Sequence, residues 1–183
     1  MSRCSNARNE LKPAVDIYIS LGSNIEPAQH LARARDELLE WFDDGQLSPV
    51  YQSAPVGMSG ADFLNAVVAG YTTTSLRGVV DKLLEIELAH GRIRTANKFS
   101  DRTLDLDLLI YGSQTCEPDS TADNIALPHP EILEQAYVLQ PLADVAGELV
   151  HPAYGRSVNE LRHQLQADAP EKFQALTMVT LGR

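Results

Sequence analysis

The chain has 183 residues, the size of one domain, and a chain of this length buries about 70% of its unfolded surface on folding. Its 44% hydrophobic and 22% charged residues are typical of a globular protein and exclude disordered and fibrous classes. Fifteen Lys and Arg residues against 25 Asp and Glu residues give a net charge of −10, which argues against a protein that coats nucleic acid or anionic membrane. A small anionic ligand remains compatible with this charge if positive residues are concentrated locally.

The ends of the chain and its cysteines indicate the compartment. Residues 1–14 form a polar tail without an apolar run, so no secretory signal is expected, and no apolar stretch is long enough to span a membrane. The two cysteines, Cys4 and Cys116, are too few for a four-ligand metal site. Free thiols in a reducing cytosol are the preferred interpretation, and a disulfide is the less favoured one. We expect a cytoplasmic monomer with a single domain over residues 15–183.

The first half of the chain predicts three strands and one helix. Residues 16–21 alternate apolar and polar side chains, as a strand does. A helix is expected from Pro27, because proline is favoured in the first helical turn, and its apolar residues recur at helical spacing. A short strand over 47–52, a loop over 53–60 and a longer strand over 63–72 follow.

The second half continues this irregular alternation. Ser75 is expected to cap a helix that ends near Gly91, and residues 103–111 read as a central strand. Ser157 and Glu160 form a capping box before a short helix, and residues 176–181 predict a last strand. Several connections are too short for parallel crossovers, so we expect an α+β sandwich with a mainly antiparallel sheet and helices packed on it.

The strongest chemical signal is a pair of carboxylates within the 103–111 strand. Residues two apart on a strand face the same side, so Asp105 and Asp107 project together while Leu104, Leu106 and Leu108 face the other way. Mg²⁺ commonly takes one or two carboxylates and completes its shell with water and substrate phosphates. The alternative is that the two acids only line a solvated face.

A basic segment leads directly into this pair. Residues 92–102 contain four basic residues and one acid: Arg92, Arg94, Lys98 and Arg102 against Asp101. Guanidinium groups for phosphate oxygens next to acids for a metal would suit a metal–polyphosphate complex. The alternative is an exposed basic loop that pairs with surface acids. The sequence has no Walker A loop, so a P-loop does not hold any bound ATP.

Other residues have two interpretations each. His129 lies in a stiff Pro128-His-Pro130 segment and could face a phosphate or simply be exposed. Asn65 is unusual inside a strand, and its amide could bind a heterocycle edge or the neighbouring loop. The remaining candidates are aromatic rings that either stack on a ligand or belong to the core, and one acid near a helix end that would ordinarily be a surface charge: Phe63, Phe99, Tyr137 and Glu87.

Taken in order, these segments resemble 6-hydroxymethyl-7,8-dihydropterin pyrophosphokinases, a family of folate biosynthesis. The resemblance covers about residues 16–151 and rests on eight motifs: Tyr18-Ile-Ser-Leu-Gly-Ser-Asn24, Ala54-Pro-Val-Gly57, Phe63-Leu-Asn65, Ile86-Glu87, Gly91-Arg-Ile-Arg94, Arg102-Thr-Leu-Asp-Leu-Asp107, Pro128-His-Pro130 and Tyr137-Val-Leu-Gln-Pro-Leu142. The basic motif followed by the strand with its two acids is the most specific part.

The resemblance implies a ferredoxin-like α+β fold that transfers pyrophosphate from MgATP to the pterin hydroxymethyl oxygen and releases AMP. Two Mg²⁺ ions would be held by Asp105 and Asp107, and Arg92 and Arg94 would share the catalytic role with these acids. The loop over 92–99 would close over ATP. The implied ATP contacts are Glu87, Arg92, Arg94, Lys98, Arg102 and His129, and the implied pterin contacts are Ser53, Ala54, Val56, Phe63, Asn65 and Tyr137.

Three positions depart from the family pattern. The family usually has Arg six residues after the His of P-H-P, where this chain has Gln135, and a Pro where it has Asp101. Phe99 replaces a Trp found in some relatives. One alternative is therefore a weakened paralogue that only binds pterin or nucleotide. The other is a D-x-D glycosyltransferase, which leaves the Gly91-Arg-Ile-Arg94 and Pro128-His-Pro130 motifs unexplained.

Overall fold

A six-stranded antiparallel sheet forms the middle of the molecule. The computed structural model describes residues 13–57, 59–92, 101–118 and 125–181. The strands are β1 (Val15–Ser23), β2 (Asp43–Leu47), β3 (Val50–Ser53), β4 (Phe63–Thr72), β5 (Asp105–Tyr111) and β6 (Thr177–Val179). They are ordered β5-β1-β4-β3-β6, with β2 also paired to β4.

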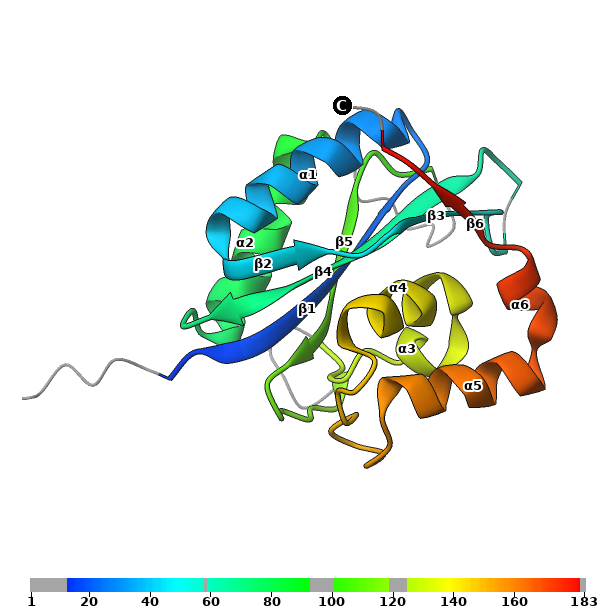
Figure 1. The fold of residues 1–183 in the computed structure, drawn as a ribbon. Helices are drawn as coiled ribbons and strands as arrows, with labels where there is room; N and C mark the ends of the chain where they lie inside the picture. The colour runs from blue at the N-terminus through cyan, green and yellow to red at the C-terminus, as the bar shows by residue number, and fades with distance from the viewer. Residues whose placement is uncertain (1–12, 58, 93–100, 119–124, 182–183) are drawn as a thin grey trace, which may run out of the picture.

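The helices cover both faces of this sheet (Figure 1). They are α1 (Pro27–Trp41), α2 (Leu76–Ala89), α3 (Glu131–Glu134), α4 (Ala136–Ala146), α5 (Val158–Asp168) and α6 (Pro170–Gln174). The α+β architecture with an antiparallel sheet is therefore confirmed. Among the described residues no helix is long and apolar enough to cross a membrane.

One face of the sheet carries α1 and α2. Ile17, Ile19 and Leu21 of β1 are fully buried there, as their period-two spacing predicts. α1 begins at Pro27 as expected, and the Ser75 hydroxyl accepts a hydrogen bond from the Gly78 N–H at 3.3 Å to cap α2.

A buried histidine pair joins these two helices. The Nδ1 atoms of His30 on α1 and His90 at the end of α2 are 2.8 Å apart, and Nε2 of His90 lies 3.3 Å from Oε1 of Glu37. Burial lowers the pKa of His90 below its ordinary value, and Glu37 acts in the opposite direction. Burial of His90 therefore favours its neutral form.

The other face carries α3, α4 and α5, of which only α5 was predicted. α4 contains Pro141, a residue that argues against a helix interior, although its apolar residues recur at helical spacing. Its Leu139 and Leu142 pack with Ile132 of α3 and Leu161 of α5. Both halves of the predicted capping box at Ser157 are present.

The prediction of one continuous strand over 47–52 is wrong. Two strands, β2 and β3, flank Ser48 and Pro49, because proline lacks the N–H that a ladder needs. Ser48 instead exchanges hydrogen bonds with Val67: its N–H donates to the Val67 carbonyl and its hydroxyl accepts from the Val67 N–H, both at 2.9 Å.

The C-terminal segment returns to the sheet and to α3. β6 pairs antiparallel with β3, with Val179 opposite Val50. Nζ of Lys172 in α6 donates to the carbonyl oxygen of Glu134 at 2.7 Å. Cys116 is a free thiol, and Cys4 with the rest of the predicted tail up to residue 12 lies outside the described residues.

Candidate active site

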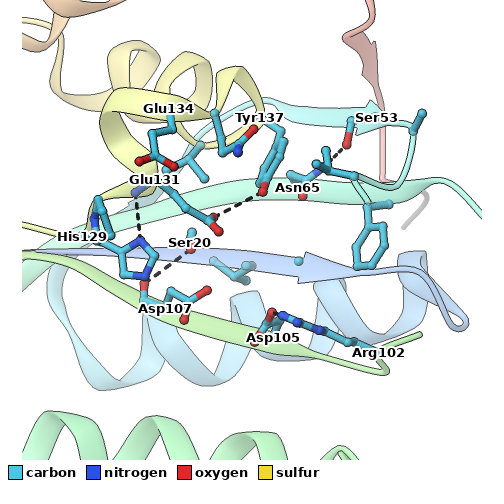
Figure 2. Close-up of a pocket in the computed structure, with 18 residues that line it drawn as sticks. Ser20, Ser53, Asn65, Arg102, Asp105, Asp107, His129, Glu131, Glu134 and Tyr137 are labelled. Carbon is cyan, nitrogen blue, oxygen red and sulfur yellow. Dashed lines mark hydrogen bonds and ion pairs between the residues drawn. The ribbon is translucent and has the colours of Figure 1, made fainter. Parts of the chain in front are cut away.

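A cavity of about 580 Å³ opens between β1, β4 and β5 on one side and α3 and α4 on the other. Figure 2 shows its polar side chains converging from these elements. Eleven of its lining residues were singled out in the sequence: Ser53, Ala54, Val56, Phe63, Asn65, Arg102, Asp105, Asp107, His129, Gln135 and Tyr137. The structure thus brings together residues predicted for the metal, the phosphates and the pterin.

β5 presents its two acids to this cavity. Asp105 pairs with Gly22 and Asp107 with Ser20 in the β1–β5 ladder. Both aspartates line the cavity, whereas Leu106 and Leu108 pack into the core on the opposite face. The same-face geometry expected from the strand period is therefore present.

Asp105 is the centre of a partly buried ion-pair network. The guanidinium groups of Arg92 and Arg102 both pair with its carboxylate. Arg92 also pairs with Glu87 and donates to the carbonyl oxygen of Leu104 at 3.2 Å. The network ties the end of α2 to the start of β5.

Glu87 is not the surface charge that its position on a helix suggested. Glu87 is 2% exposed, and its Oε1 accepts a hydrogen bond from the Leu106 N–H at 2.9 Å and also pairs with Arg92. A buried carboxylate needs such partners, because removal from water strongly disfavours an isolated charge. Glu87 therefore fixes Arg92 in the orientation that reaches Asp105.

Asn24, in the turn after β1, holds the backbone of Arg102. Its Oδ1 accepts from the Arg102 N–H at 2.7 Å, and its own N–H donates to the Arg102 carbonyl at 3.1 Å. Its Nδ2 reaches Oδ1 of Asp101 at 2.6 Å. Asn24 belongs to a motif noted in the sequence but was given no role there, since nothing local to the turn identifies a partner so distant in the chain.

Asn65 and Ser53 form the opposite wall of the cavity. Nδ2 of Asn65 donates to Oγ of Ser53 at 3.0 Å and to the carbonyl of Tyr51 at 3.3 Å. The Asn65 side chain thus bonds to the neighbouring strand β3 and not to the loop that one of its two interpretations named. It also lines the cavity, as the other interpretation required.

The third wall comes from the segment that follows the cis Leu127–Pro128 bond. The His129 N–H donates to the Leu109 carbonyl at 2.8 Å, which anchors this segment to β5. The Tyr137 hydroxyl donates to Oε2 of Glu131 at 3.3 Å. Burial raises the pKa of both groups, and nearby Asp107 raises both further.

Glu131 and Glu134 line the cavity and were missed in the sequence. The only signal was their place directly after Pro128-His-Pro130, in a helix too short to show periodicity. With Asp105 and Asp107 they make four acids around one cavity.

A second cavity of about 340 Å³ adjoins the first and shares Asp107, His129 and Pro130 with it. Glu87 lies at its wall. The rest of the lining is apolar and comes from α2, β5 and the segment before Pro128: Val80, Leu83, Leu84, Leu106, Leu108, Ile125 and Ala126. A flat apolar group with polar atoms at one edge would suit this space.

The side chains fit Mg²⁺ held jointly with phosphate. Within the part of the chain that the structure describes, no three His, Cys, Asp or Glu side chains converge as a protein-only metal site requires. Two carboxylates beside arginines match an ion that completes its shell with substrate oxygens. Three predicted residues, Arg94, Lys98 and Phe99, and with them most of the predicted lid over 92–99, lie outside the described residues.

The family model for 7,8-dihydro-6-hydroxymethylpterin-pyrophosphokinase (HPPK) matches residues 18–147. The chain belongs to this family. A Pseudomonas aeruginosa HPPK, 2-amino-4-hydroxy-6-hydroxymethyldihydropteridine pyrophosphokinase, is 37% identical over 150 residues, which cover 79% of this chain and 88% of that enzyme. The Methylorubrum extorquens enzyme of the same name is 35% identical over 162 residues, covering 86% and 98%.

Solved HPPK domains share the fold. The wild-type Plasmodium falciparum HPPK-DHPS with pterin and p-hydroxybenzoate superposes with a TM-score of 0.64 at 13% identity. The match covers 95% of this chain and 46% of that one, so this chain spans about half the length of that HPPK-DHPS chain.

Proposed function

We propose that this protein transfers the β,γ-pyrophosphoryl group of ATP to the hydroxymethyl oxygen of 6-hydroxymethyl-7,8-dihydropterin and releases AMP. The observation that carries the proposal is one cavity in which the Asp105–Asp107 pair and Arg102 face Asn65 and Tyr137. The membership of the chain in the HPPK family supports the same reaction.

The two adjoining cavities suggest how the substrates divide the site. The adenosine of ATP would occupy the smaller, largely apolar cavity, and its phosphates would extend past His129 and Asp107 into the larger one. Arg102 and Arg92 already lie beside Asp105, and guanidinium groups bind phosphate oxygens in a bidentate way. The predicted Arg94 and Lys98 contacts to ATP stay predictions.

Asp105 and Asp107 are the residues that would hold Mg²⁺. When bound, the ion neutralises phosphate charge and aligns the reacting oxygens. The number of ions, two in the sequence prediction, stays part of the proposal. Arg92 and Arg102 pair with Asp105, and their guanidinium groups would turn to the phosphate oxygens of bound ATP, because phosphate is also an anionic partner.

The pterin would bind between the walls that carry Asn65 and Tyr137. Oδ1 of Asn65 remains an acceptor while its Nδ2 is bonded to Ser53, so the side chain presents a fixed orientation to a heterocycle edge. Phe63 and Tyr137 supply the aromatic surfaces for its flat ring. Ala54 and Val56 line the same end of the cavity, where backbone groups supply further hydrogen bonds.

On this proposal the protein catalyses the reaction mainly by positioning its two substrates. The hydroxymethyl oxygen of the pterin would attack the β-phosphorus, whose bond to the oxygen bridging to the α-phosphate would break, so that AMP leaves and the hydroxyl proton is released to solvent. The protein would supply positioning and charge neutralisation rather than a covalent intermediate. Rigid strands carry Asp105, Asp107 and Asn65, so the two substrates meet at a fixed distance. The cytoplasmic location and the monomeric state stay predictions from the sequence.

The test is conversion of 6-hydroxymethyl-7,8-dihydropterin by the purified protein with ATP and Mg²⁺, followed by AMP release and by chromatography of the pterin pyrophosphate. We expect one AMP per pterin converted and no product when the metal is chelated. A protein that binds both substrates but forms no product at high MgATP, and is not restored by Gln135→Arg, would be a binding protein rather than an enzyme.

A further inference from the structure

Glu131 occupies a place in the cavity that neither the metal nor the ATP contacts require. It is the first residue of α3, and its Oε2 accepts a hydrogen bond from the Tyr137 hydroxyl at 3.3 Å. Figure 2 shows this carboxylate pointing into the cavity between Tyr137 and Asp107. It therefore lies between the proposed pterin wall and the proposed metal-binding acids.

The backbone keeps Glu131 in this position. The Gln135 N–H donates to its carbonyl oxygen at 2.9 Å and closes the single turn of α3. Lys172 holds the other end of that turn through the Glu134 carbonyl at 2.7 Å. Ile132 next to it is fully buried. A carboxylate on such an anchored turn can present an oxygen to a ligand with little loss of conformational entropy.

The second oxygen of Glu131 is the informative atom. Among the described residues the only hydrogen bond to this carboxylate comes from Tyr137, and it uses Oε2. An ionised carboxylate accepts hydrogen bonds and donates none, so Oε1 calls for an O–H or N–H donor from a ligand. A hydroxyl group on a ring stacked against Tyr137 would be such a donor.

We propose that Glu131 selects the hydroxymethyl substituent of the pterin, accepting its O–H at Oε1 while Oε2 fixes Tyr137. The proposal rests on the proposed function and adds a specificity-determining residue to it. The same bond would aim the hydroxymethyl oxygen toward the space beside Asp107, where the phosphates are proposed to lie. A pterin with a methyl group at this position has no proton to offer and leaves the carboxylate unpartnered.

A hydrogen bond to a charged group should favour the hydroxymethyl ligand by about 10- to 150-fold. We would measure the binding of 6-hydroxymethylpterin and 6-methylpterin by calorimetry, without nucleotide and with a chelator, so that no metal contributes. Glu131→Gln, which keeps the size of the side chain and removes its charge, should reduce the preference to about threefold or less. Glu134→Gln is the matched control, because it removes a charge from the same cavity and the same helix without a bond to Tyr137.

Tyr137→Phe tests the coupling between the two residues. It keeps the ring but frees the carboxylate, so the preference should shrink, and Glu131→Gln added to it should cause little further loss. Equal binding of the two pterins by the unaltered protein, or an equal loss in Glu134→Gln and Glu131→Gln, would overturn the proposal. If neither pterin binds the unaltered protein, the proposed function fails as well, and the two failures are thus distinguished.

Discussion

Glu87→Gln should destabilise the protein although it changes one side chain by a single atom. The glutamine can still accept the Leu106 N–H, which donates to Glu87 at 2.9 Å. It cannot carry the charge that pairs with Arg92. Asp105 is then left to pair with both Arg92 and Arg102.

The size of the destabilisation depends on the ion-pair partners that Arg92 keeps in Glu87→Gln. Removing one partner of a buried ion pair outright costs about 3–5 kcal/mol. Arg92 keeps Asp105 as a second partner, so the appropriate range is that of one hydrogen bond to a charged group, about 1.5–3 kcal/mol. For a chain of this length each kcal/mol shifts the melting temperature by about 2–4 °C, which gives a decrease of about 3–12 °C.

The assay is thermal unfolding followed by circular dichroism, with Glu85→Gln as the control. Glu85 lies on the same helix, but its side chain is 70% exposed and pairs with Lys82 at 3.2 Å, so its loss should cost about 0–1 kcal/mol. A Glu87→Gln protein that melts within a degree of the unaltered protein, or no lower than Glu85→Gln, would refute the idea that the Arg92 network is held by Glu87.

Three further predictions concern the site and pH. Asp105→Asn and Asp107→Asn should both nearly abolish AMP release. Only Asp105→Asn should lower the melting temperature, because the ion pairs that the structure describes at these two acids all involve Asp105. Equal melting temperatures for the two variants would contradict this. Gln135→Arg should tighten MgATP binding by one to two decades, because a hydrogen bond to a charged group contributes about 1.5–3 kcal/mol. An unchanged KM for ATP would show that the other cations already neutralise the phosphates. Urea denaturation should show stability falling as the pH drops below about 6.5, because burial lowers the pKa of His90 and His151 and the unfolded chain then binds more protons. His90→Gln and His151→Gln should each remove part of that fall, and a slope unchanged in both would exclude these histidines.

Local patterns in the sequence predicted the elements whose burial is one-sided. β1 and α2 have apolar residues at the period of their element and a more polar opposite side, so their type and most of their bounds followed from the residues alone. β4 differs, because it is buried on both faces: Val68 packs in one core and Val67 in the other. α4 was not predicted although its apolar residues recur at helical spacing, because Pro141 argues against a helix interior. The break between β2 and β3 was missed because both strands are short.

The same distinction between local patterns and tertiary contacts applies to the candidate site. The shared face of Asp105 and Asp107 follows from the two-residue period of a strand, which is a local property. The burial of Glu87 depends on Arg92 and on the Leu106 N–H, which the fold brings to it from other segments. Asn24 and Glu131 likewise act on residues that only the tertiary structure places beside them. Contacts between segments that are distant in the sequence leave no pattern in a single amino-acid sequence.

The four acids around the larger cavity have a consequence for anyone who evolves this protein in the laboratory. Like charges in one cavity repel each other, so replacing Glu131, Glu134 or Asp107 with a neutral residue should make the empty protein more heat-resistant. A library selected for thermal tolerance alone would therefore accumulate substitutions not only at Glu134 but also at Asp107 and Glu131, to which roles in substrate binding are proposed. Selection in the presence of MgATP and the pterin would oppose this bias at Asp107 and Glu131, because an acid that binds a ligand then contributes to the melting temperature that is being selected.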